Sequence, residues 1–127
     1  MFSLWGLKED NDAVRGEGCF DMVMQKMDML REAGVFFGAS ITATSKSCDE
    51  VTSDEFMKML SDKGCLWSWF FHYVPVGDSP DVSLVPNAKQ RQQILKAVYN
   101  ARNTLPMMTV DFWGDGPEMM GCIAGGR

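Results

Sequence analysis

The feature that most constrains the fold is the most apolar run of the chain, Cys65 to Gly77, which reads CLWSWFFHYVPVG. It is rich in aromatic and β-branched residues, and it ends at Pro75 and Gly77, which favour a turn. This composition predicts a strand, Cys65–Val76, buried on both faces, as at the centre of a parallel sheet. Its carboxyl end, Val74 to Gly77, then lies where such sheets bind ligands.

Three helices are predicted around this strand. The first has apolar residues at helical spacing and ends at Gly34; its stripe is Phe20, Val23, Met24, Met27 and Leu30. The second covers Ser53–Lys63 and opens with the capping box Thr52–Glu55. The third is capped by Asn87, with Gln90 three residues on. Its inner stripe is Ile94, Val98, Ala101 and Leu105.

Three further strands are predicted at Phe2–Trp5, Val35–Thr42 and Met107–Trp113, and the polar segment Lys8–Gly18 is predicted to be a loop. The order is β-α-β-α-β-α-β, which indicates an α/β fold with a parallel sheet and right-handed crossovers. Residues 1–113 then form one domain, and the glycine-rich residues 114–127 form a loop or frayed tail.

Composition narrows the class of protein. The 127 residues suffice for one domain, and the net charge of −5, with both signs interleaved, argues against a nucleic-acid or anionic-membrane surface. No long apolar helix or cleavable signal pattern is visible, so a cytoplasmic location is expected. The cysteines Cys19, Cys48, Cys65 and Cys122 form no C-x-x-C pair, which favours reduced, mostly buried thiols.

The predicted sheet is not fully covered. Three helices most naturally cover one face, whereas Val35–Thr42 and Cys65–Val76 look buried on both. Either the sheet closes against another chain or the rest of a larger domain, or it is a compact open α/β domain. The first interpretation predicts self-association of the isolated chain through exposed sheet edges.

The N-terminal part resembles a segment of the radical S-adenosylmethionine (radical SAM) enzymes. In that family a strand ending S-[LI]-[DE]-G leads to a loop with an aspartate, then to R-G-x-G-[ST]-[FY] and a helix. The matching residues here are Ser3, Gly6, Asp12, Arg15, Gly16, Gly18 and Phe20. Trp5 stands where an acidic residue is usual, and Cys19 replaces a serine or threonine.

Later segments extend the resemblance over nearly the whole chain. The letters SITAT look like the following family strand, and FFHYVPVG looks like the strand that ends in a P-x-G-like turn. The closing GCIAGGR is similar to the junction with a SPASM-type extension, in which Cys122 would be the first auxiliary-cluster cysteine. The family's C-x-x-x-C-x-x-C signature is absent, so the resemblance implies the second half of a partial (β/α) barrel that lacks its cluster-binding half.

The resemblance implies roles for six residues in binding S-adenosylmethionine (SAM): Ser3, Arg15, Thr42, Val74, Pro75 and Val76. Ser3 would face the ribose or amino-acid end, Arg15 the carboxylate, and Val74 to Val76 the adenine. The complete enzyme would use SAM and a [4Fe–4S] cluster to form a 5′-deoxyadenosyl radical that attacks a small-molecule or peptide substrate. Neither cofactor is expected to bind tightly to this chain alone.

Each of these residues also has a simpler interpretation. Ser3 and Thr42 could bond their own loops, Arg15 could be solvated or brace Asp12, and Pro75 could serve only the turn. His72 is a core histidine or, if it faces a barrel interior, the substrate-side proton handler. Neither Asp111 nor Asp115 has a visible partner. A second class of function remains open: a non-catalytic α/β interaction module that pairs with a partner chain.

Overall fold

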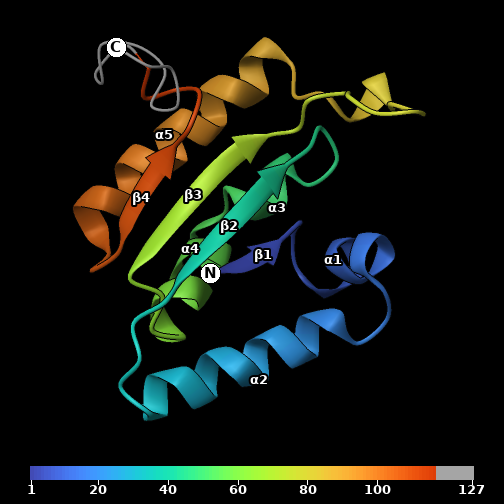
Figure 1. Cartoon of the computed structure of the whole chain (residues 1–127). Coiled ribbons are helices and arrows are strands. Elements are labelled where there is room, and N and C mark those ends of the chain that lie inside the picture. Colours follow the sequence, from blue (N-terminus) through green and yellow to red (C-terminus); the bar gives the residue numbers. More distant parts are fainter. Residues whose placement is uncertain (117–127) are drawn as a thin grey trace, which may run out of the picture.

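Four strands form one parallel sheet in the computed structural model, which describes residues 1–116 (Figure 1). They are β1 (Phe2–Leu4), β2 (Gly38–Ala43), β3 (Trp67–His72) and β4 (Met108–Asp111). The strands lie in the order β1-β2-β3-β4, and every neighbouring pair is parallel. The fold is therefore α/β, as the alternation of helical and strand patterns predicts.

Helices connect the strands, and the main three agree with the sequence pattern. These are α2 (Cys19–Glu32), α4 (Asp54–Asp62) and α5 (Ala88–Thr104). Two additional helices, α1 (Lys8–Arg15) and α3 (Cys48–Val51), precede α2 and α4, and a 3-10 turn, η1 (Val82–Leu84), precedes α5. The predicted strands shorten: β2 begins at Gly38 instead of Val35, and β3 ends at His72 instead of Val76.

The helices pack against only one face of the sheet. Strand residues paired in register point to the same face, and the buried face carries Leu4, Ala39, Ile41, Ala43 and Phe70. These join α2, α4 and α5 in one core, which includes Met27, Phe56, Leu60, Ile94 and Val98. We call the opposite face the open face. Its residues are partly exposed: Ser3, Ser40, Thr42, Trp69, Phe71 and Val110.

The central strand β3 is buried on one face, not on both as its composition predicts. Ser68 and Phe70 are fully buried, whereas Trp67, Trp69 and Phe71 alternate with them and are partly exposed. The prediction fails because no helix among residues 1–116 covers the open face. The aromatic residues that suggested double burial stand on that face.

The segment Lys8–Gly18 is mostly a helix, so the loop prediction is wrong for α1. The helix is fixed by contacts from elsewhere in the chain. The Leu7 N–H donates to Glu50 Oε2 at 2.7 Å, and Trp5 N donates to the buried Asn11 Oδ1 at 3.2 Å. An anionic carboxylate at a helix start is favourable. The helix α1 lacks the apolar stripe that would predict it, because its buried residue is the polar Asn11.

Two predicted caps have different outcomes. The capping box of α5 is confirmed: Gln90 N donates to Asn87 Oδ1, and Asn87 N donates to Gln90 Oε1, both at 3.0 Å. The cap of α4 is Ser53, which accepts from Phe56 N at 3.1 Å, and not Thr52. Thr52 instead ends α3, and its hydroxyl donates to Cys48 O at 2.7 Å.

No helix found within residues 1–116 combines the length and the apolar character that crossing a membrane requires. The predicted tail, residues 114–127, lies mostly outside the described residues. Its first residues form a turn directly after β4, in which Asp115 N donates to Asp111 O at 3.0 Å.

Candidate functional site

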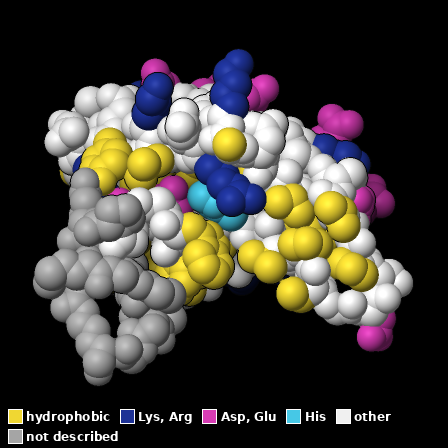
Figure 2. Space-filling view, turned by 90° about the horizontal axis from the view of Figure 1, so that it is seen from above, with side chains coloured by type: hydrophobic (Ala, Val, Ile, Leu, Met, Phe, Trp, Pro, Cys, Tyr) yellow, Lys and Arg dark blue, Asp and Glu magenta, His cyan; other side chains and the backbone are white. Residues whose placement is uncertain are grey.

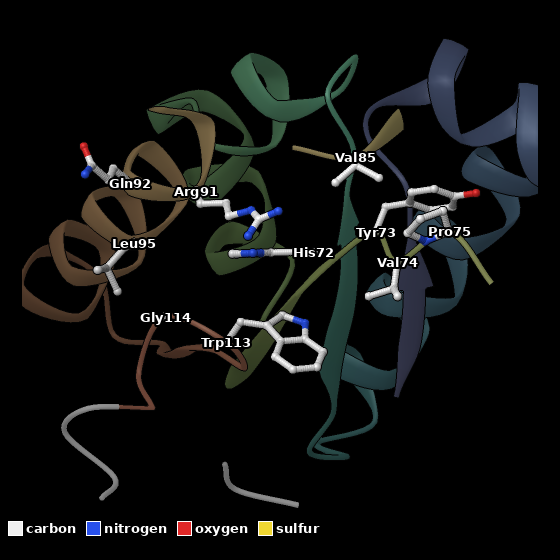
Figure 3. Close-up of a pocket in the computed structure, with 10 residues that line it drawn as sticks. All are labelled: His72, Tyr73, Val74, Pro75, Val85, Arg91, Gln92, Leu95, Trp113 and Gly114. Carbon is white, nitrogen blue, oxygen red and sulfur yellow. The ribbon is translucent and has the colours of Figure 1, made fainter. Parts of the chain in front are cut away.

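A cavity of about 460 Å³ opens at the carboxyl edge of the sheet, between the ends of β3 and β4 and the start of α5 (Figure 3). Its walls are mostly apolar: Tyr73, Val74, Pro75, Val85, Leu95 and Trp113. The polar side chains that line it are His72, Arg91 and Gln92. Seen from above, the single histidine lies beneath a basic side chain and between hydrophobic groups (Figure 2).

The loops around the cavity are tied to the sheet by backbone hydrogen bonds. Tyr73 N donates to Ala43 O at 2.9 Å, which continues the pairing of β3 with β2 beyond His72. Ser45 N, just after β2, donates to Leu84 O at 2.8 Å. The Gln90 side chain donates to Ser45 O at 2.8 Å and so fixes the start of α5. Residues distant in sequence therefore meet in a defined arrangement.

His72 and Asp111 form the buried centre of this site. His72 Nε2 lies 3.2 Å from Asp111 Oδ1, and the side chains are 9% and 0% exposed. Register places both on the helix-covered face, because Ala43 pairs with His72 and Phe70 pairs with Asp111. His72 therefore does not point from the open face. Its side chain lines the cavity at the edge of the sheet.

Asp111 is held by the turn that follows it. Its Oδ1 accepts from Gly114 N at 2.9 Å and from Trp113 N at 3.1 Å. Burial raises the pKa of Asp111, but His72 and these two N–H groups outweigh burial and leave the pKa below its ordinary value. Asp111 is therefore a carboxylate at neutral pH, and it can orient the imidazole of His72.

A second carboxylate supports the first. Asp115 Oδ2 accepts from Asp111 N at 2.9 Å and pairs with the guanidinium of Arg102. Arg102 also donates to Thr109 O and lies over the Tyr99 ring, 5.0 Å from its centre. Gly114 fits closely between Asp111 and Leu95, since a methyl group there would stand 2.2 Å from Asp111 Oδ2 and 2.8 Å from Leu95 Cδ1. The turn 111–115 thus holds two buried carboxylates, Asp111 facing His72 and Asp115 paired with Arg102.

Arg91 provides the free charge in the cavity. Its Nε donates to Pro86 O at 3.0 Å, and its Nη atoms have no partner among residues 1–116. Figure 3 shows its guanidinium group extended over the imidazole of His72. A guanidinium held at Nε keeps the donor pair on Nη1 and Nη2, which binds a carboxylate end-on through two parallel hydrogen bonds.

The residues predicted from the sequence fall in three places. Val74 and Pro75 line the cavity with His72, whereas Val76 is 77% exposed and is not part of its lining. Ser3 and Thr42 lie on the open face, away from His72.

Arg15 and Cys122 are not joined to this site. Arg15 is exposed at the end of α1 and makes no ion pair or hydrogen bond within residues 1–116. It does not brace Asp12, whose carboxylate accepts from Gly18 N at 3.0 Å and Phe20 N at 2.7 Å. Cys122 lies outside the described residues.

Arg91, Asp111 and Trp113 complete the site, and the sequence did not point to them as a group. The available signal was positional: Asp111 and Trp113 end a predicted strand, where parallel sheets place ligands. Arg91 had no such signal, since it lies on the first turns of a helix with an ordinary polar face.

Comparison with known proteins adds no identity. No family model matches the chain, and no curated protein matches it. Among residues 1–116, no group of three or more histidine, cysteine or acidic side chains is arranged to hold a metal ion. The class that the fold defines is therefore that of a parallel α/β sheet with a cavity at its carboxyl edge.

Proposed function

We propose that this chain is the C-terminal half of a radical SAM barrel, which contributes contacts to SAM and to the substrate. The observation that supports this most is the strand order. Strands that run β1-β2-β3-β4 with α2, α4 and α5 packed on one face are the arrangement of a (β/α) barrel segment. A doubly wound sheet instead reverses its strand order and covers both faces with helices.

The open face has the polarity that the inside of such a barrel needs. Register forms a row from Ser3 and Ser40 to Trp69 and Val110, so that hydroxyls on β1 and β2 give way to apolar groups on β3 and β4. The same change occurs in the next row, from Thr42 to Phe71. Hydroxyls suit a ribose and an amino-acid group, and an aromatic surface suits substrate or the missing strands.

The residues fit SAM better than they fit a cluster. Val74 and Pro75 offer an apolar wall to an adenine at the carboxyl edge, and Ser3 and Thr42 offer hydroxyls on the open face. Cys48 and Cys65 are buried thiols with a pKa raised by burial to about 11, which disfavours the thiolate that a cluster requires. The cluster would therefore be held by the other half of the barrel.

In the complete enzyme, SAM and its [4Fe–4S] cluster would supply reductive cleavage of the cofactor and hydrogen-atom abstraction from the substrate. This chain would position SAM and the substrate and would exclude water from them. Phe71 and Phe112, with ring centres 4.9 Å apart, would form the apolar wall. His72 lies with Asp111 on the helix-covered face, outside the barrel interior, so it is given no part in this chemistry.

Reconstitution tests the proposal. The chain is mixed anaerobically with a cluster-bearing N-terminal half of a radical SAM barrel, and complex formation and 5′-deoxyadenosine are measured. We expect a complex and product, both lost in Phe71→Lys on the open face and retained in Val82→Lys, which is on η1 and 70% exposed. A complex without product would favour the interaction module, and no complex would reject the barrel half.

A further inference from the structure

We propose that the cavity at the carboxyl edge binds a small monocarboxylate with an apolar body, with Arg91 as its anchor. This inference uses only contacts within this chain. It does not depend on the radical SAM proposal, because no barrel half or cofactor is needed to form the cavity.

The guanidinium of Arg91 is held in one orientation at the cavity. Most surface arginines are mobile, but Nε of this residue is fixed by Pro86 O at 3.0 Å. Pro86 is itself buried and lies one residue before the cap of α5. The bond to Nε fixes the plane of the guanidinium, and the Nη groups have no partner within residues 1–116. A planar, oriented pair of donors matches the two oxygens of a carboxylate.

His72 forms the floor of the cavity. His72 lies under the guanidinium in Figure 3; its Nε2 is turned toward Asp111 Oδ1 at 3.2 Å, and its Nδ1 makes no hydrogen bond within residues 1–116. The imidazole is thus a buried polar group with capacity for a ligand. A ligand oxygen that reaches it gains a second polar contact, and buried polar groups strongly favour such a partner.

The charged groups around the cavity limit the ligand to one negative charge. Arg91 is the only basic side chain that lines the cavity within the described part of the chain. Asp111 lies directly behind His72 and is ionised, while Asp115 is already paired with Arg102. A dianion would face the field of Asp111 with one cation to offset it.

The shape and the apolar lining of the cavity determine the body of the ligand. In Figure 3, Leu95 lies on one side of the cavity and Val74, Pro75 and Val85 lie on the other, with Trp113 below His72. A volume of about 460 Å³ is within the range of small-molecule sites. Apolar walls with one fixed cation at the rim select a ligand with a carboxylate at one end and an aliphatic or aromatic body.

The test uses 3-phenylpropionate, its neutral analogue 3-phenylpropanamide and 3-phenylpropylphosphonate as probes of the full chain, at an alkaline pH at which the phosphonate is a dianion. Binding is followed by calorimetry and by ¹H–¹⁵N spectra, with the Trp113 indole N–H as a local reporter. We expect the carboxylate to bind at least about tenfold more tightly than the amide and than the phosphonate, and the Trp113 signal to shift.

Variants decide whether Arg91 is the anchor. Arg91→Gln should abolish the preference for acid over amide, and Arg91→Lys should retain only part of it. Lys96→Gln, which removes the same charge from an exposed position on the same helix, should leave binding unchanged. Equal binding of acid and amide, binding of neither, or an acid preference that survives Arg91→Gln would each overturn the proposal. Because Arg91 is exposed, its variants should fold, which circular dichroism checks.

Discussion

Asp111 and His72 lie on adjacent strands, and their side chains approach to 3.2 Å inside the protein. The pair couples the end of β3 to the turn after β4, because the same Asp111 oxygen also accepts from Gly114 N and Trp113 N. Removal of the charge should therefore be felt as a pH-dependent change in stability.

The sign of that dependence follows from the lowered pKa of Asp111. Its pKa lies below the ordinary value of 3.8 in the folded state, so its stabilising effect is complete above that value. The effect is lost as the pH falls from there through the folded pKa. We expect the free energy of unfolding of Asp111→Asn to fall less steeply with acid than that of the wild type.

Urea unfolding of both chains from about pH 6 to about pH 3 measures this difference. Asp78→Asn is the control, because Asp78 is exposed in the loop after β3 and lies outside the cavity lining. Identical pH profiles for wild type and Asp111→Asn would show that Asp111 is not stabilised by its partners.

The pairing of His72 with Asp111 also shows what the sequence could and could not predict. Each residue was singled out, and each lies on a predicted strand. Their contact depends on the register of β3 against β4, in which Phe70 pairs with Asp111. A shift by one residue would send either side chain to the other face. Hydrophobic pattern alone does not set that register in a sheet with one open face.

The helices also divide into those fixed by local sequence and those fixed by distant contacts. Long helices with strong local signals, such as α2 with its apolar stripe and α5 with its capping box, were predicted from the chain alone. The helix α1 was missed because its start is held by Glu50, far along the chain. Arg91 was missed for a similar reason, since its role comes from the carbonyl of Pro86 and from strands that it does not adjoin in sequence.

Gly38 should tolerate no side chain. A methyl group there would stand 2.1 Å from Nε1 of Trp67, its register partner on β3. Gly38→Ala must therefore displace the indole or the strand, and we expect a loss of about 1–3 kcal/mol in the free energy of unfolding. Urea unfolding measures the loss, and a shift in tryptophan emission reports the displaced ring.

Two companion variants make the test of Gly38 specific. Ser40→Ala, on the same strand and face, should have little effect, since it removes atoms instead of adding them. Trp67→Phe should restore part of the stability lost in Gly38→Ala, because the smaller ring frees the space next to the Cα atom of residue 38. Equal losses in Gly38→Ala with and without Trp67→Phe would rule out the clash as the cause.

The three described cysteines should differ in reactivity. Burial raises the pKa of Cys48 and Cys65 to about 11, and Cys65 Sγ also lies 3.0 Å from Trp67 O. Cys19 is partly exposed at the start of α2. In the native chain carrying Cys122→Ser, Cys19 should react with a thiol reagent roughly a hundredfold faster than the other two.

Absorbance of the released thiol product at pH 8 follows this reaction. The further substitution Cys19→Ser should remove the fast phase, and addition of urea should make the remaining thiols react at one rate. A fast phase that persists without Cys19 would mean that Cys48 or Cys65 is accessible as a thiolate, and would reopen them as candidate cluster ligands.

The open face should make the isolated chain self-associate. Trp69, Phe71 and Phe112 are only partly covered there, and the Trp69 and Phe71 rings lie 6.2 Å apart as one aromatic surface. Apolar surface of this kind, on a sheet whose other face is already packed by helices, is buried by association when a partner is present. We expect the wild-type chain to sediment as a concentration-dependent oligomer.

Substitution on that face separates association through the face from association through the strand edges. Phe71→Thr keeps β-propensity and leaves the backbone edges of β1 and β4 intact, so it should shift sedimentation toward monomer only if the face is the contact. Val76→Thr is the matched control, because Val76 is 77% exposed and lies beyond the end of β3. If Phe71→Thr associates as strongly as Val76→Thr, the edges carry the contact. If the wild type is a monomer with cooperative unfolding, the sheet is complete as it stands, and the compact α/β domain replaces the barrel half.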